Sequence, residues 1–270
     1  MNLIFILPVY NSKEIIESSI NTLLEYLAIL SDQYKDLLFF IFIVNDGSND
    51  DTLFFLKKKM KYYYRFEFIK YGKKGFIYCF SYERNRGVGF AIKFALKKLA
   101  NIYKSTKFNQ RKNLFFIMDF DLPFDLSIIN ESIKNLSNYD LVNIDRTKKR
   151  ESYNVSYVRK IMHRTLIYII KLLFLKELKG IDDYVGGFKA FNDNFFNFIK
   201  DKYFISNTSL IQLELLLYAV LNRFKIFTVF PVFRKETLKF STFNIFKTFK
   251  FIFKVLFELI LIRFNLGVYK

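Results

Sequence analysis

The chain has 270 residues, of which 52% are hydrophobic, so its composition excludes general disorder and is sufficient for a substantial core. Its net charge of +18 favours partners that carry phosphates: nucleotides, nucleic acid or an anionic membrane face. A+T-rich codons also produce such Lys-, Asn- and Phe-rich chains, so composition alone does not choose among these partners. The single cysteine, Cys79, excludes an intramolecular disulfide, and its strand-like surroundings indicate a buried structural thiol.

The N-terminal half alternates short apolar runs with helical patterns. We expect strands at residues 3–7, 37–44, 76–82, 114–117 and 140–144, with helices between them. Pro8 is expected to end the first strand, and Asn11 and Glu14 are spaced as a capping box for the helix that follows. This alternation predicts an α/β fold around a mostly parallel sheet, in which ligands bind at the carboxyl ends of the strands. The loops PVYN, NDGS and DFD all fall there.

The sequence MDFDLPFD places Asp119 and Asp121 directly after a buried strand, two residues apart. Carboxylate oxygens suit Mg²⁺ or Mn²⁺, and a cation held there can clamp a diphosphate. The alternative is a strand that ends in an ordinary solvated turn, where Asp and Pro are common. Three polar loops at one sheet edge favour a ligand site over that alternative.

The segment RNRGVGF leads from a strand into a helix. Gly87 and Gly89 would let backbone approach a ligand, and Arg86 could meet a phosphate. A helix start eased by glycine explains the same residues equally well.

The C-terminal half is basic and apolar. Residues 156–178 interrupt an apolar background with lysine and arginine, which suits a helix lying in a membrane interface. His163 is the only histidine, so neither a Ser-His-Asp mechanism nor a zinc site has support. Further on we expect a turn and strand at 180–191, an apolar helix at 209–223 that carries Glu214, and a strand at 225–232.

From Thr242 onward the chain has a wide apolar arc with a narrow polar stripe. Lys247, Lys250, Lys254 and Glu258 form that stripe at helical spacing. We expect this helix to lie at the membrane surface; packing on the core and a subunit interface are the alternatives. The expected organisation is a domain at 1–238 followed by this amphipathic segment at 239–270. Neither a secretory signal nor a membrane-spanning stretch is expected.

In chain order, PVYN, VNDGSNDDT, RNRGVGFAI and MDFD resemble the motifs of inverting family 2 glycosyltransferases, which have the GT-A fold. NIDR with its basic helix, and GIDDYVGGFKAF with LELLLYA, resemble the polyprenyl-phosphate (dolichyl-phosphate) hexose synthases. The resemblance covers about residues 3–235. The sequence departs from the usual pattern at Asn45, Asp125, Val185, Gly186 and Gln212, which leaves the sugar and the acceptor open.

The resemblance implies a role for each motif. The implied donor-binding residues are Pro8, Tyr10, Asn11, Glu14, Asp46, Gly47, Ser48, Arg86 and Gly87. Asp119 would approach the ribose and diphosphate and Asp121 would ligate Mg²⁺ or Mn²⁺, so both are candidate catalytic and metal-binding residues. The implied acceptor-binding residues are Arg146, Arg159, Lys160, Gly187 and Lys189.

The resulting hypothesis is transfer of a hexose from a nucleoside diphosphate sugar to a polyprenyl phosphate, with inversion, by an enzyme bound peripherally to the cytoplasmic side of a membrane. A phosphate acceptor is already ionised and needs no strong base. The alternative acceptor is a sugar hydroxyl in a surface polysaccharide or lipid-linked oligosaccharide, with Asp182, Asp183 or Glu214 as the base.

A third reading is a nucleic-acid-binding module, based on KKKMKYYYR at Lys57 to Arg65. The solvated end of a helix explains this run better, and no other nucleic-acid-binding signature occurs in the sequence. No nucleic acid partner is therefore expected.

Overall fold

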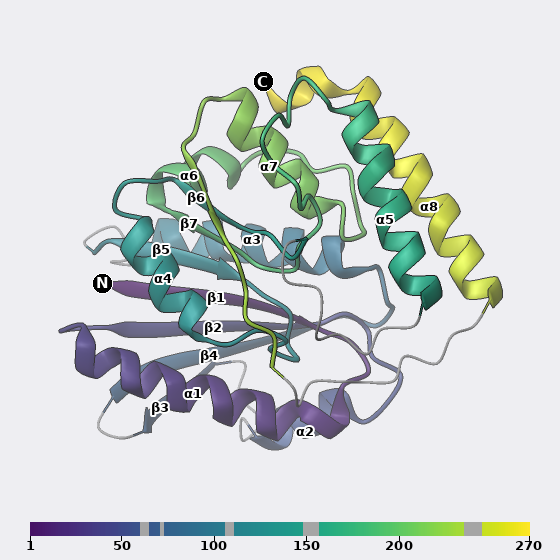
Figure 1. The fold of residues 1–270 in the computed structure, drawn as a ribbon. Helices are drawn as coiled ribbons and strands as arrows, with labels where there is room; N and C mark the ends of the chain where they lie inside the picture. Colours follow the sequence, from purple (N-terminus) through teal and green to yellow (C-terminus); the bar gives the residue numbers. More distant parts are fainter. Residues whose placement is uncertain (60–64, 71–72, 106–110, 148–156, 235–244) are drawn as a thin grey trace.

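One twisted sheet organises the computed structural model, which describes residues 1–59, 65–70, 73–105, 111–147, 157–234 and 245–270 (Figure 1). Its strands follow the order β3-β4-β2-β1-β5-β7-β6-β8. The strands are β1 (Asn2–Val9), β2 (Leu38–Asn45), β3 (Arg65–Lys70), β4 (Lys73–Ser81), β5 (Asn113–Ile117), β6 (Leu141–Ile144), β7 (Lys189–Asn192) and β8 (Ile226–Val229). Six run in one direction, whereas β3 and β7 pair antiparallel with their neighbours.

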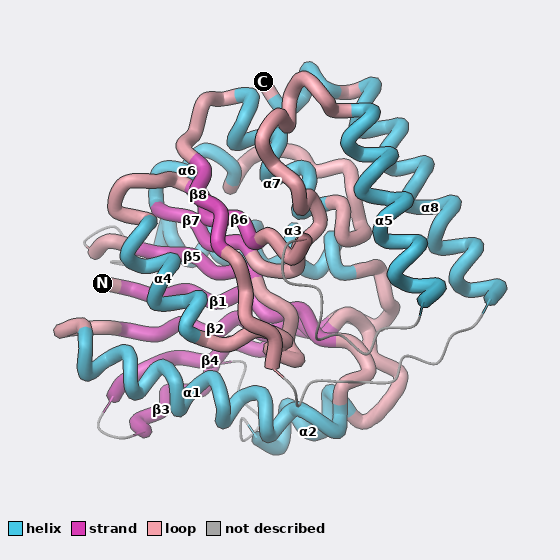
Figure 2. Tube along the Cα trace, in the orientation of Figure 1, coloured by secondary structure: helices cyan, strands magenta, loops and turns pink. Residues whose placement is uncertain are grey.

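Helices cover both faces of this sheet, as Figure 2 shows. The described α-helices are α1 (Ile16–Gln33), α2 (Thr52–Lys59), α3 (Val88–Ser105), α4 (Ser127–Asn135), α5 (Tyr157–Leu173), α6 (Asp193–Ile199), α7 (Ile211–Leu221) and α8 (Ile245–Phe264). Side chains of α1, α2 and α4 form one core with the sheet, and those of α3 and α5 to α8 form the other. Strands β1, β2, β5, β6 and β7 are buried on both sides, as their apolar runs predict.

The expected strands and long helices are confirmed, with two local corrections. Pro8 lies inside β1 rather than ending it, because pairing with β5 stops at Ile6 and the missing N–H costs no ladder bond. The capping box is wrong: a 3-10 turn at Lys13–Ile15 precedes α1, and neither N-cap side chain makes a capping hydrogen bond.

Two short elements had no clear sequence signal. Strand β3 begins at Arg65, at the end of the basic run, and residues 60–64 of that run lie outside the described residues. Helix α6 packs Phe196 against Phe115 of β5, with ring centroids 4.1 Å apart. It therefore helps to fix the strand that leads into Asp119.

Cys79 is buried in β4, as expected. Burial raises the pKa of its thiol to about 11, which keeps it protonated and unreactive at neutral pH.

Helices α5 and α8 lie side by side at one end of the molecule (Figure 1). Arg263 of α8 forms an ion pair of 2.8 Å with Glu177, just after α5, and its guanidinium lies over the ring of Phe174. Helix α8 buries Val255, Leu259 and Ile262 in the core, so it is packed on the domain through one face. None of the helices in the described parts of the chain is long and apolar enough to cross a membrane.

Candidate active site

Asp46 joins two of the predicted donor-binding loops. It is buried directly after β2, and its carboxylate accepts four hydrogen bonds from residues 82–87. Donors to one oxygen are the Tyr82 hydroxyl (2.7 Å) and the Arg86 N–H (2.8 Å). The Asn85 amide (2.9 Å) and the Gly87 N–H (3.0 Å) donate to the other. In this structure the Asp46 carboxylate holds the loop in place. It would therefore influence the predicted binding of a sugar nucleotide through this loop.

Two glycines next to these hydrogen bonds leave no room for a side chain: Gly47 in the NDGS loop and Gly87 in the loop that Asp46 holds. Gly47 has φ +60°, and a Cβ there would lie 2.3 Å from the backbone of Arg84. Gly87 has φ +100°, and a Cβ there would lie 2.2 Å from the carbonyl oxygen of Asn207. The glycines therefore serve close backbone packing. The Arg86 side chain remains exposed and lies over Phe90, 4.1 Å from the ring centroid.

The PVYN loop is fastened to the NDGS loop. The Asn11 N–H donates to the Ser48 hydroxyl, and the Asn11 side chain accepts from the Asn49 N–H, both at 2.9 Å. Asn11 has φ +45°, which asparagine tolerates better than most residues. Tyr10 is 42% exposed beside this junction and Pro8 is half-buried. These contacts bring the predicted donor residues together, except that Glu14 is exposed and no contact ties it to the group.

Asp119 and Asp121 lie in a tight turn after β5. The Leu122 N–H donates to the Asp119 carbonyl at 3.1 Å, and Leu122 has φ +47°. Both aspartates are partly exposed. The carboxylate of the nearby Asp125 is engaged elsewhere: it accepts the N–H of Ser127, the first residue of α4, at 2.8 Å, and hydrogen bonding to Ser127 lowers its pKa.

The second half of the chain meets this turn at Gly187. A Cβ at Gly187 would lie 2.1 Å from Oδ2 of Asp119, so any larger residue there would force the Asp119 carboxylate to move. The antiparallel pairing of β7 with β5 produces this approach. Gly187 was predicted to bind the acceptor. The structure places it against Asp119, which was predicted to bind the sugar donor and the metal.

A buried ion cluster supports the same loop. The Arg146 guanidinium donates to both oxygens of Asp183, at 2.6 and 3.0 Å. This pairing holds the pKa of Asp183 below its usual range, against the effect of burial. The Lys189 ammonium has no exposed surface and donates to the Gly186 carbonyl at 3.2 Å.

Direct contact of Lys189 and Arg146 with an acceptor phosphate stays a prediction, and the structure shows both side chains engaged within the protein. Lys189 is enclosed, and Arg146 is committed to a buried carboxylate. In this structure both residues position the loop that carries Gly187. The side chains of Arg159 and Lys160, the other two predicted acceptor residues, lie outside the described part of α5.

The carboxylates of Asp119 and Asp121 suit a divalent cation that also binds oxygen atoms of a substrate. Among the residues that the structure describes, no three His, Cys, Asp or Glu side chains gather as a metal-binding group. Mg²⁺ and Mn²⁺ need only one or two carboxylates when phosphate oxygens and water supply the remaining ligands. Asp119 and Asp121, on one exposed turn at a sheet edge, are sufficient for such a site.

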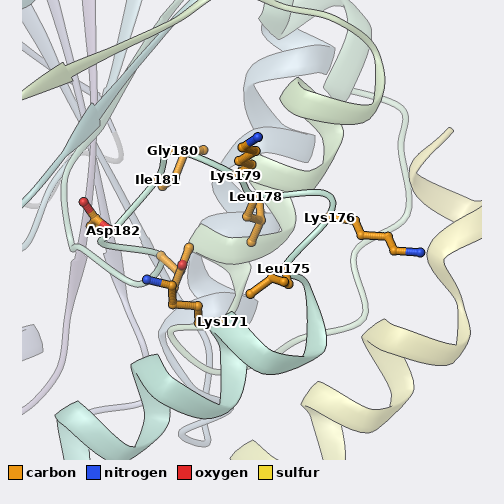
Figure 3. Close-up of a pocket in the computed structure, with 9 residues that line it drawn as sticks. Lys171, Leu175, Lys176, Leu178, Lys179, Gly180, Ile181 and Asp182 are labelled. Atoms are coloured by element: carbon orange, nitrogen blue, oxygen red, sulfur yellow. The ribbon is translucent and has the colours of Figure 1, made fainter.

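A lysine-rich cavity lies beside the loop that leads to Gly187. It has a volume of about 470 Å³ and is lined by the end of α5 and the turn after it (Figure 3). Lys171, Lys176 and Lys179 line it together with Leu175, Leu178 and Ile181, and Asp182 is its one carboxylate. The cavity therefore combines cationic and apolar surface.

Three residues that hold these loops together carry no signal that sequence reasoning could have used. Tyr82 and Asn85 bind the Asp46 carboxylate, and Asn207 packs on Gly87. An aromatic and an amide near a glycine loop are too common to single out, and the contact of Asn207 depends on the tertiary fold.

Comparison with known proteins agrees with this geometry. The family model described as "Glycosyl transferase family 2" matches residues 4–199. Glucosyl-3-phosphoglycerate synthase from Mycobacterium tuberculosis, solved with Mn²⁺, UDP and glucosyl-3-phosphoglycerate, superposes with a TM-score of 0.55 at 15% identity. That match covers 96% of this chain and 78% of the other.

S. aureus TarS 1-349 is a weaker match, with a TM-score of 0.48 at 18% identity over 85% of this chain and 58% of the other. No curated protein matches significantly. The family match spans most of the chain and covers the Asp46 loop, the Asp119 turn and Gly187. The chain therefore belongs to glycosyl transferase family 2 and is a glycosyltransferase with the GT-A fold.

Proposed function

We propose that the protein transfers a hexose, with inversion, from a nucleoside diphosphate sugar to a polyprenyl phosphate at the cytoplasmic face of a membrane. The donor half of the proposal rests on the joined loops at Asn11, Ser48 and Asp46, next to the turn with Asp119 and Asp121. A solved structure of the same fold holds UDP and Mn²⁺, which supports a nucleotide sugar as the donor.

In this proposal the chain binds the nucleotide against Tyr10 and the Asp46 loop and holds the diphosphate near Asp121. A cation bound there stabilises the negative charge that develops on the leaving diphosphate. The side chain of Arg86, which belongs to the Asp46-bound loop, is exposed and would add a second positive charge.

The exposed surface of α5 and α8 supports the acceptor half of the proposal, which is transfer to a polyprenyl phosphate at a membrane. Phe253, Phe257 and Phe264 of α8 point out of the domain and are exposed, as are Tyr168 and Leu172 of α5. Exposed lysines accompany them. Large apolar side chains with a basic rim suit the interface of an anionic membrane. The lysine-rich cavity adjoins this surface and offers a place for a lipid phosphate.

The candidate bases support a phosphate acceptor over a sugar hydroxyl. Asp183 is locked to Arg146. Glu214 is buried and accepts hydrogen bonds from the Ile205 and Ser206 N–H groups and from the Tyr269 hydroxyl. Only Asp182 of the three is exposed. A phosphate acceptor, which is already ionised, fits this shortage of available bases.

Labelled nucleotide sugars, incubated with the enzyme, polyprenyl phosphate and Mg²⁺ or Mn²⁺, should yield an organic-soluble, acid-labile product. Asp121→Asn should reduce that transfer by at least about a hundredfold, because the charge on the leaving group loses its stabilisation. Transfer at the wild-type rate by this variant would refute the metal assignment. Label that enters only acid-stable glycosides would instead show a hydroxyl acceptor.

Asp125→Asn is the matched control, four residues away on the same segment. Asp125 accepts the N–H of Ser127 at the start of α4 and has no place in the proposed chemistry. This variant should keep the wild-type rate and the wild-type dependence on metal concentration.

A further inference from the structure

Helix α8 reaches the donor-binding loop through one buried carboxylate. Glu258 lies on the inner face of α8 and is 6% exposed. One of its oxygens accepts from the hydroxyls of Ser206 and Thr208, at 2.6 and 2.7 Å. The other accepts the Asn207 N–H at 3.2 Å. A single side chain of α8 thus binds three consecutive residues.

Segment 206–208 in turn packs against the start of α3. The Gly89 N–H donates to the Asn207 carbonyl at 3.0 Å. A side chain at either glycine of this contact would clash with segment 206–208. A Cβ at Gly87 would lie 2.2 Å from the Asn207 carbonyl oxygen, and a Cβ at Gly89 would lie 2.5 Å from the Thr208 carbonyl oxygen. The two backbones are therefore in direct contact, and neither can move without the other.

The last link joins this contact to the donor site. The Gly87 and Arg86 N–H groups both donate to the Asp46 carboxylate. A continuous series of hydrogen bonds and close backbone contacts thus runs from Glu258 through segment 206–208 and Gly87 to Asp46. Two further contacts hold this part of the chain. The Glu214 carboxylate of α7 accepts the Ser206 N–H, and the Lys93 side chain of α3 donates to the Phe204 carbonyl. Glu258 is the residue of α8 that helps to hold segment 206–208 in place.

We propose that Glu258 is a positioning residue for nucleotide binding, acting through segment 206–208 on the loop at residues 85–87. The inference rests on the proposed function, because that function makes this loop part of the donor site. It assigns α8 a second role: the helix completes the donor site with its inner face, whatever its outer face binds.

Three variants separate this role from simple attachment of the helix. Glu258→Leu removes the three acceptor contacts and leaves polar groups buried. Glu258→Gln keeps one carbonyl acceptor, and its amide can donate to the two hydroxyls, which rotate freely. Glu177→Leu is the matched control, because it breaks the ion pair between Glu177 and Arg263 of α8 and does not touch segment 206–208.

Calorimetry with UDP and GDP, each with Mn²⁺, measures nucleotide affinity, and hydrogen exchange measures protection of residues 85–92. We expect Glu258→Leu to weaken nucleotide binding about tenfold and to speed exchange in that segment. The KM for the donor should rise more than kcat falls. Glu258→Gln should restore most of the affinity, and Glu177→Leu should bind nucleotide as the wild type does.

Wild-type affinity and exchange in Glu258→Leu would overturn the inference, as would an equal loss of affinity in Glu177→Leu. If the wild type bound neither nucleotide, the donor assignment of the proposed function would fail instead. The exchange of residues 85–92 would then decide by itself whether Glu258 holds this loop.

Discussion

Lys189 shows how strongly one residue's surroundings can alter its chemistry. An ordinary lysine has a pKa of about 10.4. Burial lowers the pKa of Lys189 to about 7, the carboxylates of Asp183 and Asp119 oppose this decrease, and Arg146 adds to it. From about pH 7 to pH 10 the unfolded chain therefore binds a proton at this position that the folded chain has lost. The free energy of unfolding rises with pH over that range.

Replacing Lys189 tests that linkage. Lys189→Met removes the group from both states, so its free energy of unfolding should rise less steeply above pH 7. The difference in slope is at most about 1.4 kcal/mol per pH unit. Urea unfolding at several pH values between 7 and 9 measures it, with Lys134→Met, at an exposed lysine of α4, as the control. Identical slopes in Lys189→Met and the wild type would contradict the effect of burial.

At the scale of single elements, the two roles proposed for α8 belong to opposite faces of the helix. Phe257 is 62% exposed, and the next residue, Glu258, is buried against segment 206–208. The helical period places these neighbours on different sides. The buried face explains why the helix packs on the core. The exposed face remains available for the proposed membrane contact. The two alternatives considered from sequence are therefore compatible.

The outer face can be tested without disturbing the inner one. Replacing Phe253, Phe257 and Phe264 of α8 by serine should weaken binding to vesicles of phosphatidylcholine and phosphatidylglycerol at least about tenfold, because each exposed ring would otherwise enter the interface. The free energy of unfolding should change by less than about 0.5 kcal/mol per site, since the rings are exposed. Vesicle flotation measures the binding.

Phe54 and Phe55 provide the control, because they are also exposed but lie on α2. Their replacement by serine should leave flotation unchanged. Equal losses in the two sets of variants would mean that vesicle binding depends on general hydrophobicity and not on α8.

At the scale of the whole molecule, the two halves of the chain meet at one carboxylate. Asp119 follows β5 in the first half, and the loop before β7 brings Gly187 against it from the second half. The proposed donor and acceptor sides are adjacent because an antiparallel strand, β7, lies next to β5. The buried pair of Arg146 and Asp183 holds that loop from behind.

Gly187→Ala tests this junction. The added methyl group would force the Asp119 carboxylate to move, and a displacement of about 1 Å costs about a hundredfold in rate. We expect kcat at saturating donor to fall by roughly that factor while the fold is kept. Gly267→Ala, where nothing lies within 4 Å of an added Cβ, should behave as the wild type. An unchanged kcat in Gly187→Ala would show that the position of Asp119 does not limit transfer.

The sequence by itself determined the α/β alternation and the edge of the sheet where Asp46 and Asp119 lie. Both depend on local signals: short apolar runs form buried strands, and each run ends in polar residues that suit a loop. Cys79 was predictable as a buried thiol for the same reason. The capping box at Asn11 failed because a tertiary partner, Asn49, binds the side chain that would have capped the helix.

Only the tertiary structure decided what these residues contact. The partners of Asp46 lie 36 to 41 residues further along the chain, and Glu258 binds residues 50 to 52 positions before it. Such contacts follow from the order of the strands and from the reversed direction of β7, and neither leaves a periodic signal in the sequence. Residue types could therefore indicate a candidate site, but the packing of distant segments determined which carboxylates stay partly exposed and which are buried and hold the fold.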